Sequence, residues 1–188
     1  MARPPRLQPA GGIFRITARG NRGQEIFTDE RDRERFVRLL EEVVARFGWV
    51  CHAYCLMSNH FHLLIETPDA NLSRGMHRLN FSYAQWFNHE HGFEGHLFQR
   101  RFHSVRVESN WHLIELSRYI VLNPVRAGLC ADPGDWPWSS YRAVIAVIRP
   151  PRFLTVRWLL EQFGSDPSRA AAAFASFVRD TPRRTRAP

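Results

Sequence analysis

The 188-residue sequence contains no lysine, so all 26 of its basic side chains are arginine. It also has no apolar run near the ~20 residues that a membrane-crossing helix needs. Residues 1–12 lack the apolar stretch of a signal peptide. We therefore expect a cytoplasmic protein without a membrane partner. The length suits one well-cored domain with a small appendage.

Cysteine is scarce as well, with three residues at positions 51, 55 and 130. An odd number without zinc-ribbon spacing argues against a disulfide framework or a structural zinc site. A strand through residues 51–55 would place Cys51 and Cys55 on one face. We expect both to be small buried apolar residues in a reducing compartment.

Acidic residues are outnumbered, which leaves a net charge of +8 and predicts a polyanionic partner. The absence of lysine itself is more typical of a genomic bias than of function. Arg3 and Arg6 lie in a Pro-rich segment typical of a basic arm that reaches along nucleic acid, and an unremarkable disordered terminus is the equal alternative. A phosphate-contacting rim is expected from seven further arginines: Arg19, Arg22, Arg74, Arg78, Arg100, Arg101 and Arg106. The aromatic and histidine-rich stretch 89–103 is suited to stacking on unpaired bases.

Apolar periodicity predicts the order strand, helix, strand, strand, helix, strand, followed by further helices. The strands are expected at 13–19, 49–57, 60–66 and 102–107, and the helices at 29–47, 72–89, 111–122, 156–163 and 168–178. This order is the pattern of a ferredoxin-like α+β sandwich. We expect helices on one face of an antiparallel sheet, with the other face available for a site.

His60 and His62 flank Phe61 in the third predicted strand. Residues two apart in a strand point the same way, so both imidazoles project from one face while Phe61 turns to the core. Such a pair is suited to binding a metal. Hydrogen bonding at a sheet surface is the alternative.

Tyr119 and Asn123 lie four residues apart and share a helix face. Pro124 disfavours helical geometry at Asn123, which is therefore expected at the helix end. Its amide oxygen could complete a metal site with the two histidines, and Tyr119 would stand beside a metal-bound phosphate. Taken alone, such a tyrosine more often serves packing. Tyr54, Tyr83 and Tyr141 are other possible nucleophiles, but none has this context.

Together, the segments 54–64 and 117–129 closely resemble the REP-associated tyrosine transposases, single-tyrosine HUH transposases of the insertion-sequence-200-like family. The resemblance extends over about 11–141 through further motifs at 17–23, 71–76, 95–102 and 136–141. We expect a catalytic domain over 13–145, a basic arm over 1–12, and a helical extension with a basic tail over 146–188.

By this resemblance, His60, His62 and Asn123 match metal ligands and Tyr119 matches the nucleophile. The implied activity is cleavage and rejoining of single-stranded or hairpin DNA through a 5′-phosphotyrosine, by a monomer or homodimer. The family's turn before the first histidine commonly carries proline where this chain has Ser58, a change that removes no ligand. Ligand softness favours manganese or another transition ion, whereas the resemblance implies Mg²⁺ or Mn²⁺.

Two other functions fit some of these residues. A catalytically silent hairpin-binding protein would share the basic charge, but it would not need all four site residues. A small metal hydrolase would use the histidine pair, but the charge and the lack of a clear carboxylate base near the pair argue against it.

Overall fold

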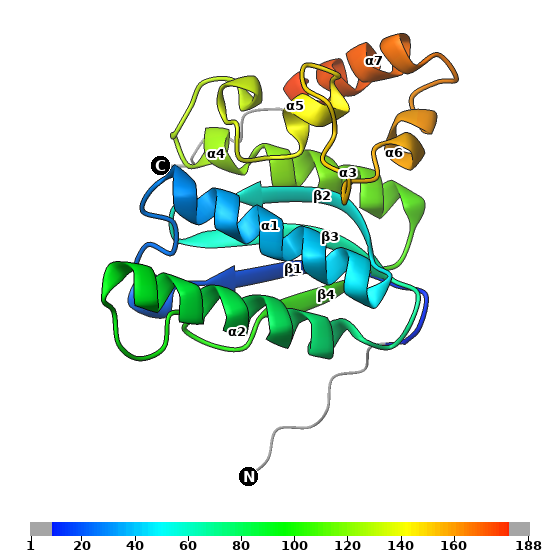
Figure 1. Cartoon of the computed structure of the whole chain (residues 1–188). Helices are drawn as coiled ribbons and strands as arrows, with labels where there is room; N and C mark the ends of the chain where they lie inside the picture. Colours follow the sequence, from blue (N-terminus) through cyan, green and yellow to red (C-terminus); the bar gives the residue numbers. More distant parts are fainter. Residues whose placement is uncertain (1–8, 181–188) are drawn as a thin grey trace, which may run out of the picture.

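The computed structural model describes residues 9–180 and arranges them around a four-stranded sheet (Figure 1). The strands are β1 (Gly12–Arg19), β2 (Val50–Leu56), β3 (His60–Thr67) and β4 (His103–Val107). The principal helices are α1 (Glu30–Phe47), α2 (Leu72–His91), α3 (Asn110–Val121) and α7 (Pro167–Arg179). Short helical segments are η1 (Asn21–Gly23), α4 (Asn123–Arg126), η2 (Pro133–Asp135), α5 (Tyr141–Val144) and α6 (Arg157–Glu161).

The sheet order is β2-β3-β1-β4, and every neighbouring pair is antiparallel. β1 and β2 are therefore parallel to each other, with β3 inserted between them. This split arrangement confirms the ferredoxin-like α+β class and the expected order of elements.

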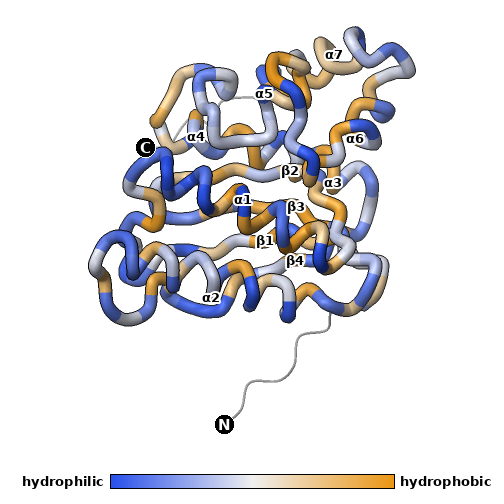
Figure 2. Tube along the Cα trace, in the orientation of Figure 1, coloured by the Kyte–Doolittle hydropathy of each residue, from blue (hydrophilic) through white to orange (hydrophobic). Residues whose placement is uncertain are grey.

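One face of the sheet is covered by α1 and α2, as predicted (Figure 1). Alternate β1 residues Phe14, Ile16 and Ala18 point into this core because successive side chains in a strand face opposite ways. Figure 2 shows apolar positions recurring along α1 and through the strands. Asp29 caps α1 in a reciprocal capping box, and Gly48 ends the helix in the left-handed conformation.

The expectation that helices occupy one face only was wrong. α3 packs on the opposite face, where Ile120 and Leu113 join a second core with Leu64 of β3. The C-terminal helices then cover the outer side of α3, with Phe174 and Val178 in a third core. α3 has apolar residues on two opposite sides, so its own sequence does not reveal which side packs on the sheet. Because both sides are packed, α3 is held between the sheet and the C-terminal helices.

The two cysteines of β2 are fully buried, as expected, but they do not share a face. Cys51 pairs with Ile65 of β3 and Ala53 pairs with Leu64, so β2 has one residue more than β3 at this point. Such a bulge reverses the alternation, so Cys51 lies in the core under α1 and Cys55 in the core under α3. Sequence alternation alone gives no sign of this irregularity.

Asp32, in the first turn of α1, forms hydrogen bonds with the residue Thr28 before the helix and with His91 at the end of α2. Its buried carboxylate accepts hydrogen bonds from the Thr28 backbone N–H and hydroxyl at 2.7 Å each. It also lies 2.8 Å from the His91 ring nitrogen. Burial raises the pKa of this carboxyl, but the bonds from His91 and Thr28 outweigh it, and the net shift is downward.

We expect Asp32→Asn to lower the free energy of unfolding at neutral pH by about 1–3 kcal/mol, because the ionised acceptor is lost. Since the folded pKa lies below the unfolded value, the Asp32 contribution is complete above the unfolded pKa and disappears as pH falls through the folded pKa. Urea unfolding of both proteins at decreasing pH would show their stabilities converging in acid. An unchanged difference across that range would contradict the assignment, and exposed Asp69→Asn is the matched control.

Candidate active site

The two histidines of β3 project onto the face of the sheet that α3 covers. His60 pairs across the ladder with Arg19 of β1, and His62 pairs with Thr17. Their rings lie 4.9 Å apart between centroids and are nearly perpendicular, at 86°. Phe61 between them is buried in the opposite core, so the predicted alternation is confirmed.

Each imidazole is oriented by a hydrogen bond at Nδ1. His60 Nδ1 lies 2.7 Å from Asn59 Oδ1, and His62 Nδ1 lies 3.1 Å from the Thr17 hydroxyl. An amide oxygen only accepts, so His60 carries its proton on Nδ1 and leaves the Nε2 lone pair outward. His62 Nε2 is buried without a hydrogen-bond partner. The Nε2 atoms are therefore the atoms suited to a further ligand.

Both imidazoles are held in the neutral form. Burial lowers the pKa of His62 to about 3, with His60 and Arg15 adding to the effect. Burial also lowers the pKa of His60, and the Arg19 guanidinium adds to this shift. A neutral imidazole retains the lone pair that a metal requires.

Tyr119 comes from α3 and lies beside the histidines. Its ring is 6.1 Å from the His62 ring, at an interplanar angle of 86°, and its side chain is half-buried. The other three tyrosines, at 54, 83 and 141, are at most 5 % exposed, and burial raises the pKa of each. Tyr119 is thus the one tyrosine of the four that an external substrate can approach.

Two arginines that the sequence analysis did not select flank Tyr119. The Arg126 guanidinium lies 4.7 Å from the centre of the tyrosine ring, and that of Arg15 lies 5.8 Å from it. Arg15 shares the outward face of β1 with Thr17, and Arg126 follows Tyr119 by two helical turns. The alternation of β1 was visible in the sequence, but the approach of α3 to it was not.

Asn123 lies at the α3–α4 junction, as its position before Pro124 predicts. Proline lacks an N–H and cannot donate to the Ile120 carbonyl four residues earlier. The Asn123 amide nitrogen replaces that bond at 3.2 Å and also reaches the Tyr119 carbonyl at 2.8 Å. Since carbonyls only accept, these contacts turn Oδ1 away from the helix end.

The donor set fits a divalent metal that takes nitrogen and oxygen ligands. His62 Nε2 is a buried atom without a partner, and His60 Nε2 belongs to a neighbouring neutral ring. In residues 9–180, no three His, Cys, Asp or Glu side chains are grouped so that they could hold a metal ion. A metal bound at the two histidines would therefore need any further protein ligand from another residue type, such as an amide oxygen.

Comparison with known proteins identifies the family. Residues 13–123 match the family model described as "Transposase IS200 like". The chain belongs to the IS200-like transposase family. Its members transfer DNA strands, so this chain is placed among DNA strand-transfer enzymes. The matched range includes β1 from its second residue, β2 to β4, His60, His62, Tyr119 and Asn123.

Two known proteins are similar to this chain over most of their own length. A Haemophilus influenzae protein with the assigned name of REP-associated tyrosine transposase is 26% identical over 159 residues, which cover 74% of this chain and 86% of the relative. A solved structure of a REP-associated tyrosine transposase bound to a REP hairpin superposes with a TM-score of 0.66 at 21% identity. It covers 82% of this chain and 92% of the other, which shows that the fold is shared.

The predicted arginine rim of this transposase-family chain does not form one surface. Arg19 is the last residue of β1 and lies on the histidine face. Gly20, the next residue, pairs with Phe98, and this pairing places Arg22, Arg100 and Arg101 near the same end of the strand. Arg74 and Arg78 are exposed on α2, which covers the opposite face of the sheet, and Arg106 pairs with Phe14 of that face. Arg3 and Arg6 lie outside the described residues.

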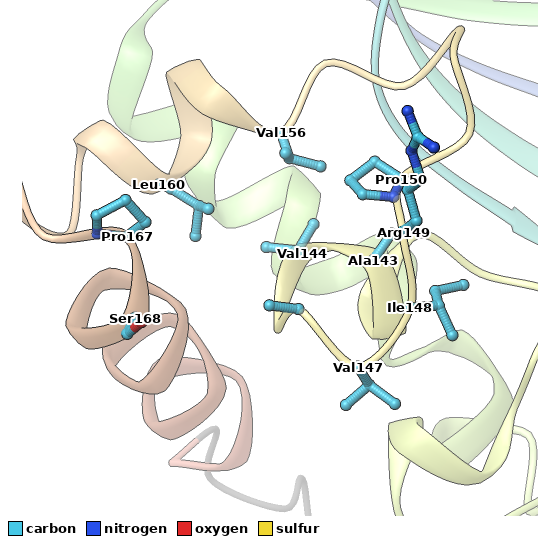
Figure 3. Close-up of a pocket in the computed structure, with 11 residues that line it drawn as sticks. Ala143, Val144, Val147, Ile148, Arg149, Pro150, Val156, Leu160, Pro167 and Ser168 are labelled. Atoms are coloured by element: carbon cyan, nitrogen blue, oxygen red, sulfur yellow. The ribbon is translucent and has the colours of Figure 1, made fainter.

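A separate hollow of about 380 Å³ lies between α5, α6 and the start of α7 (Figure 3). Its walls are mostly aliphatic, with Val144, Val156 and Leu160 pointing inward. Its polar side chains are those of Ser168 and Arg149, and no histidine or tyrosine of the described residues lines it.

Within residues 9–180, no helix combines the length and apolar character that crossing a membrane would demand.

Proposed function

We propose that this protein cuts and rejoins single-stranded or hairpin DNA through a 5′-phosphotyrosine formed on Tyr119. The ligands of a Mg²⁺ or Mn²⁺ ion are His60, His62 and Asn123. The observation that carries the proposal is the placement of the one accessible tyrosine 6.1 Å from the His62 ring, whose buried Nε2 is without a partner.

Tyr119 provides the nucleophile. Its phenolic oxygen forms a bond to phosphorus while the bond from phosphorus to the 3′-oxygen breaks, and the phenol's proton ends on the released 3′-hydroxyl. One phosphodiester replaces another, so the reverse attack by a 3′-hydroxyl rejoins the strand without a nucleotide cofactor. A divalent ion held by His60, His62 and Asn123 would polarise the scissile phosphate and stabilise the charge that grows on it.

The surrounding side chains of the site position the reacting groups. Thr17 and Asn59 each contact an imidazole at Nδ1, which leaves the Nε2 atoms for the metal, and the α3–α4 junction holds Asn123. Arg15 and Arg126 beside the tyrosine ring place positive charge where a phosphate approaches. Packing of α3 between two cores restricts the movement of Tyr119.

A DNA substrate is supported by the net charge of +8 and by the family. The hairpin form is supported by the solved relative, which is described as bound to a REP hairpin. We expect a labelled hairpin, incubated with protein and Mn²⁺, to yield a protein–DNA adduct that survives denaturing electrophoresis. Hairpin binding without any adduct would instead indicate a catalytically silent DNA-binding protein.

The Thr17 hydroxyl gives a direct test of the metal site. Thr17→Val keeps the shape of the side chain but removes the oxygen that orients His62. Loss of such a supporting hydrogen bond typically weakens metal binding by 10- to 100-fold, so we expect about a 10-fold rise in the Mn²⁺ dissociation constant by calorimetry. Thr17→Ser retains the hydroxyl and should bind Mn²⁺ as wild type does. Equal affinity in all three proteins would show that Thr17 does not support a ligand.

A further inference from the structure

A cleft of about 780 Å³ separates α2 from the segment 95–102, away from the histidines and Tyr119. Its α2 wall presents His77 and Phe81, one helical turn apart, whose rings stack at 5.7 Å with an interplanar angle of 8°. Phe81 is 50% exposed although it is a large apolar side chain. A flat, solvent-facing aromatic pair of this kind is suited to stacking on another planar ring.

The polar side chains of the cleft suit a neutral heterocycle attached to a phosphate. The Asn80 amide oxygen is buried without a hydrogen-bond partner, although its residue lines the cleft. Gln99 contributes a second amide, and amides both donate to and accept from the edge of a base. Arg100 and Arg101 add positive charge, and none of the residues that line the cleft, all of them in the described part of the chain, is acidic.

Hydrogen bonds connect one wall of the cleft to the end of β1, whose outward face lies beside the histidines. The Gln99 backbone N–H donates to the Arg19 carbonyl at 2.9 Å, and Asn21 N–H donates to the Leu97 carbonyl at 2.8 Å. Arg19 is also the ladder partner of His60. A DNA strand that leaves the histidines past Arg19 therefore reaches the cleft around the end of β1.

We propose that this cleft binds an unpaired nucleobase of the DNA strand, stacked on Phe81 and hydrogen-bonded by Asn80, with Arg100 and Arg101 on the adjoining phosphates. The proposal rests on the proposed action on DNA but concerns a separate site. The base would fix which part of the strand lies over Tyr119. A paired base presents no open face for stacking, so the cleft selects single-stranded segments.

The test compares binding of two strands that carry the same phosphates: a 12-residue oligothymidylate and a 12-residue abasic strand. We expect wild type to bind the oligothymidylate about tenfold more tightly. Phe81→Ala should weaken oligothymidylate binding about fivefold or more and leave abasic-strand binding unchanged. Asn80→Leu should weaken the same interaction by about threefold. Phe93→Ala removes a phenylalanine that is 55% exposed but lies outside the cleft, and it should change neither affinity.

Equal wild-type affinity for the two strands would overturn the proposal. So would a Phe81→Ala effect that is absent, equal on both strands, or matched by Phe93→Ala. Thermal unfolding of each variant verifies its fold. Adduct formation by wild type is measured separately, so a missing adduct would reject the chemistry at Tyr119, whereas a missing base effect would reject the cleft.

Discussion

Replacing His62 with alanine should abolish metal-dependent cleavage of hairpin DNA, with a loss of at least ~10²-fold. The variant loses a neutral imidazole whose Nε2 is buried and unpartnered beside Tyr119. His60→Ala should have a similar effect because both rings are ligands of the proposed ion. Hairpin binding should change little, since the substitutions remove no positive charge from these neutral side chains.

The measurements are single-turnover cleavage and equilibrium binding of the same labelled hairpin. Exposed His89 on α2 gives a matched control, because His89→Ala removes an imidazole far from the sheet face in question. Calorimetry should show loss of Mn²⁺ binding both in the His62→Ala variant and in the variant that carries His60→Ala and His62→Ala together. Undiminished cleavage by the double alanine variant would reject the metal assignment.

Tyr119→Phe should reduce strand cleavage to background, because the change removes only the hydroxyl oxygen that we propose as the nucleophile. The ring that packs near Arg126, Arg15 and His62 is retained, so stability and hairpin affinity should remain close to those of wild type. The result would separate chemistry from binding.

Tyr141 provides the control for this substitution. Its hydroxyl is buried without a hydrogen-bond partner, so Tyr141→Phe should preserve both stability and cleavage. Cleavage by the Tyr119 variant at the wild-type rate would place the nucleophile elsewhere.

Much of the fold and the order of the site residues was predictable because it depends on local periodicity. Period-two alternation placed His60 and His62 on one face and Phe61 on the other, and the β3 ladder confirms it. The break at Pro124 predicted the helix end at which Asn123 lies. These features need no knowledge of distant contacts.

The remaining features depend on tertiary contacts that periodicity does not encode. The bulge in β2 reversed the face of Cys51, and the packing of α3 on the histidine face brought Tyr119 to His62. Thr17 and Arg15 became part of the site only through that arrangement. Their sequence signal was weak: polar side chains on the outward face of a strand whose inner face is apolar.

The most direct test of the account is the position of the covalent bond to DNA. Wild-type protein, Mn²⁺ and a labelled hairpin should give a denaturation-resistant adduct, and peptide mass mapping should place the added nucleotide on the fragment that contains Tyr119. An adduct on a fragment containing Tyr54, Tyr83 or Tyr141 would contradict the account.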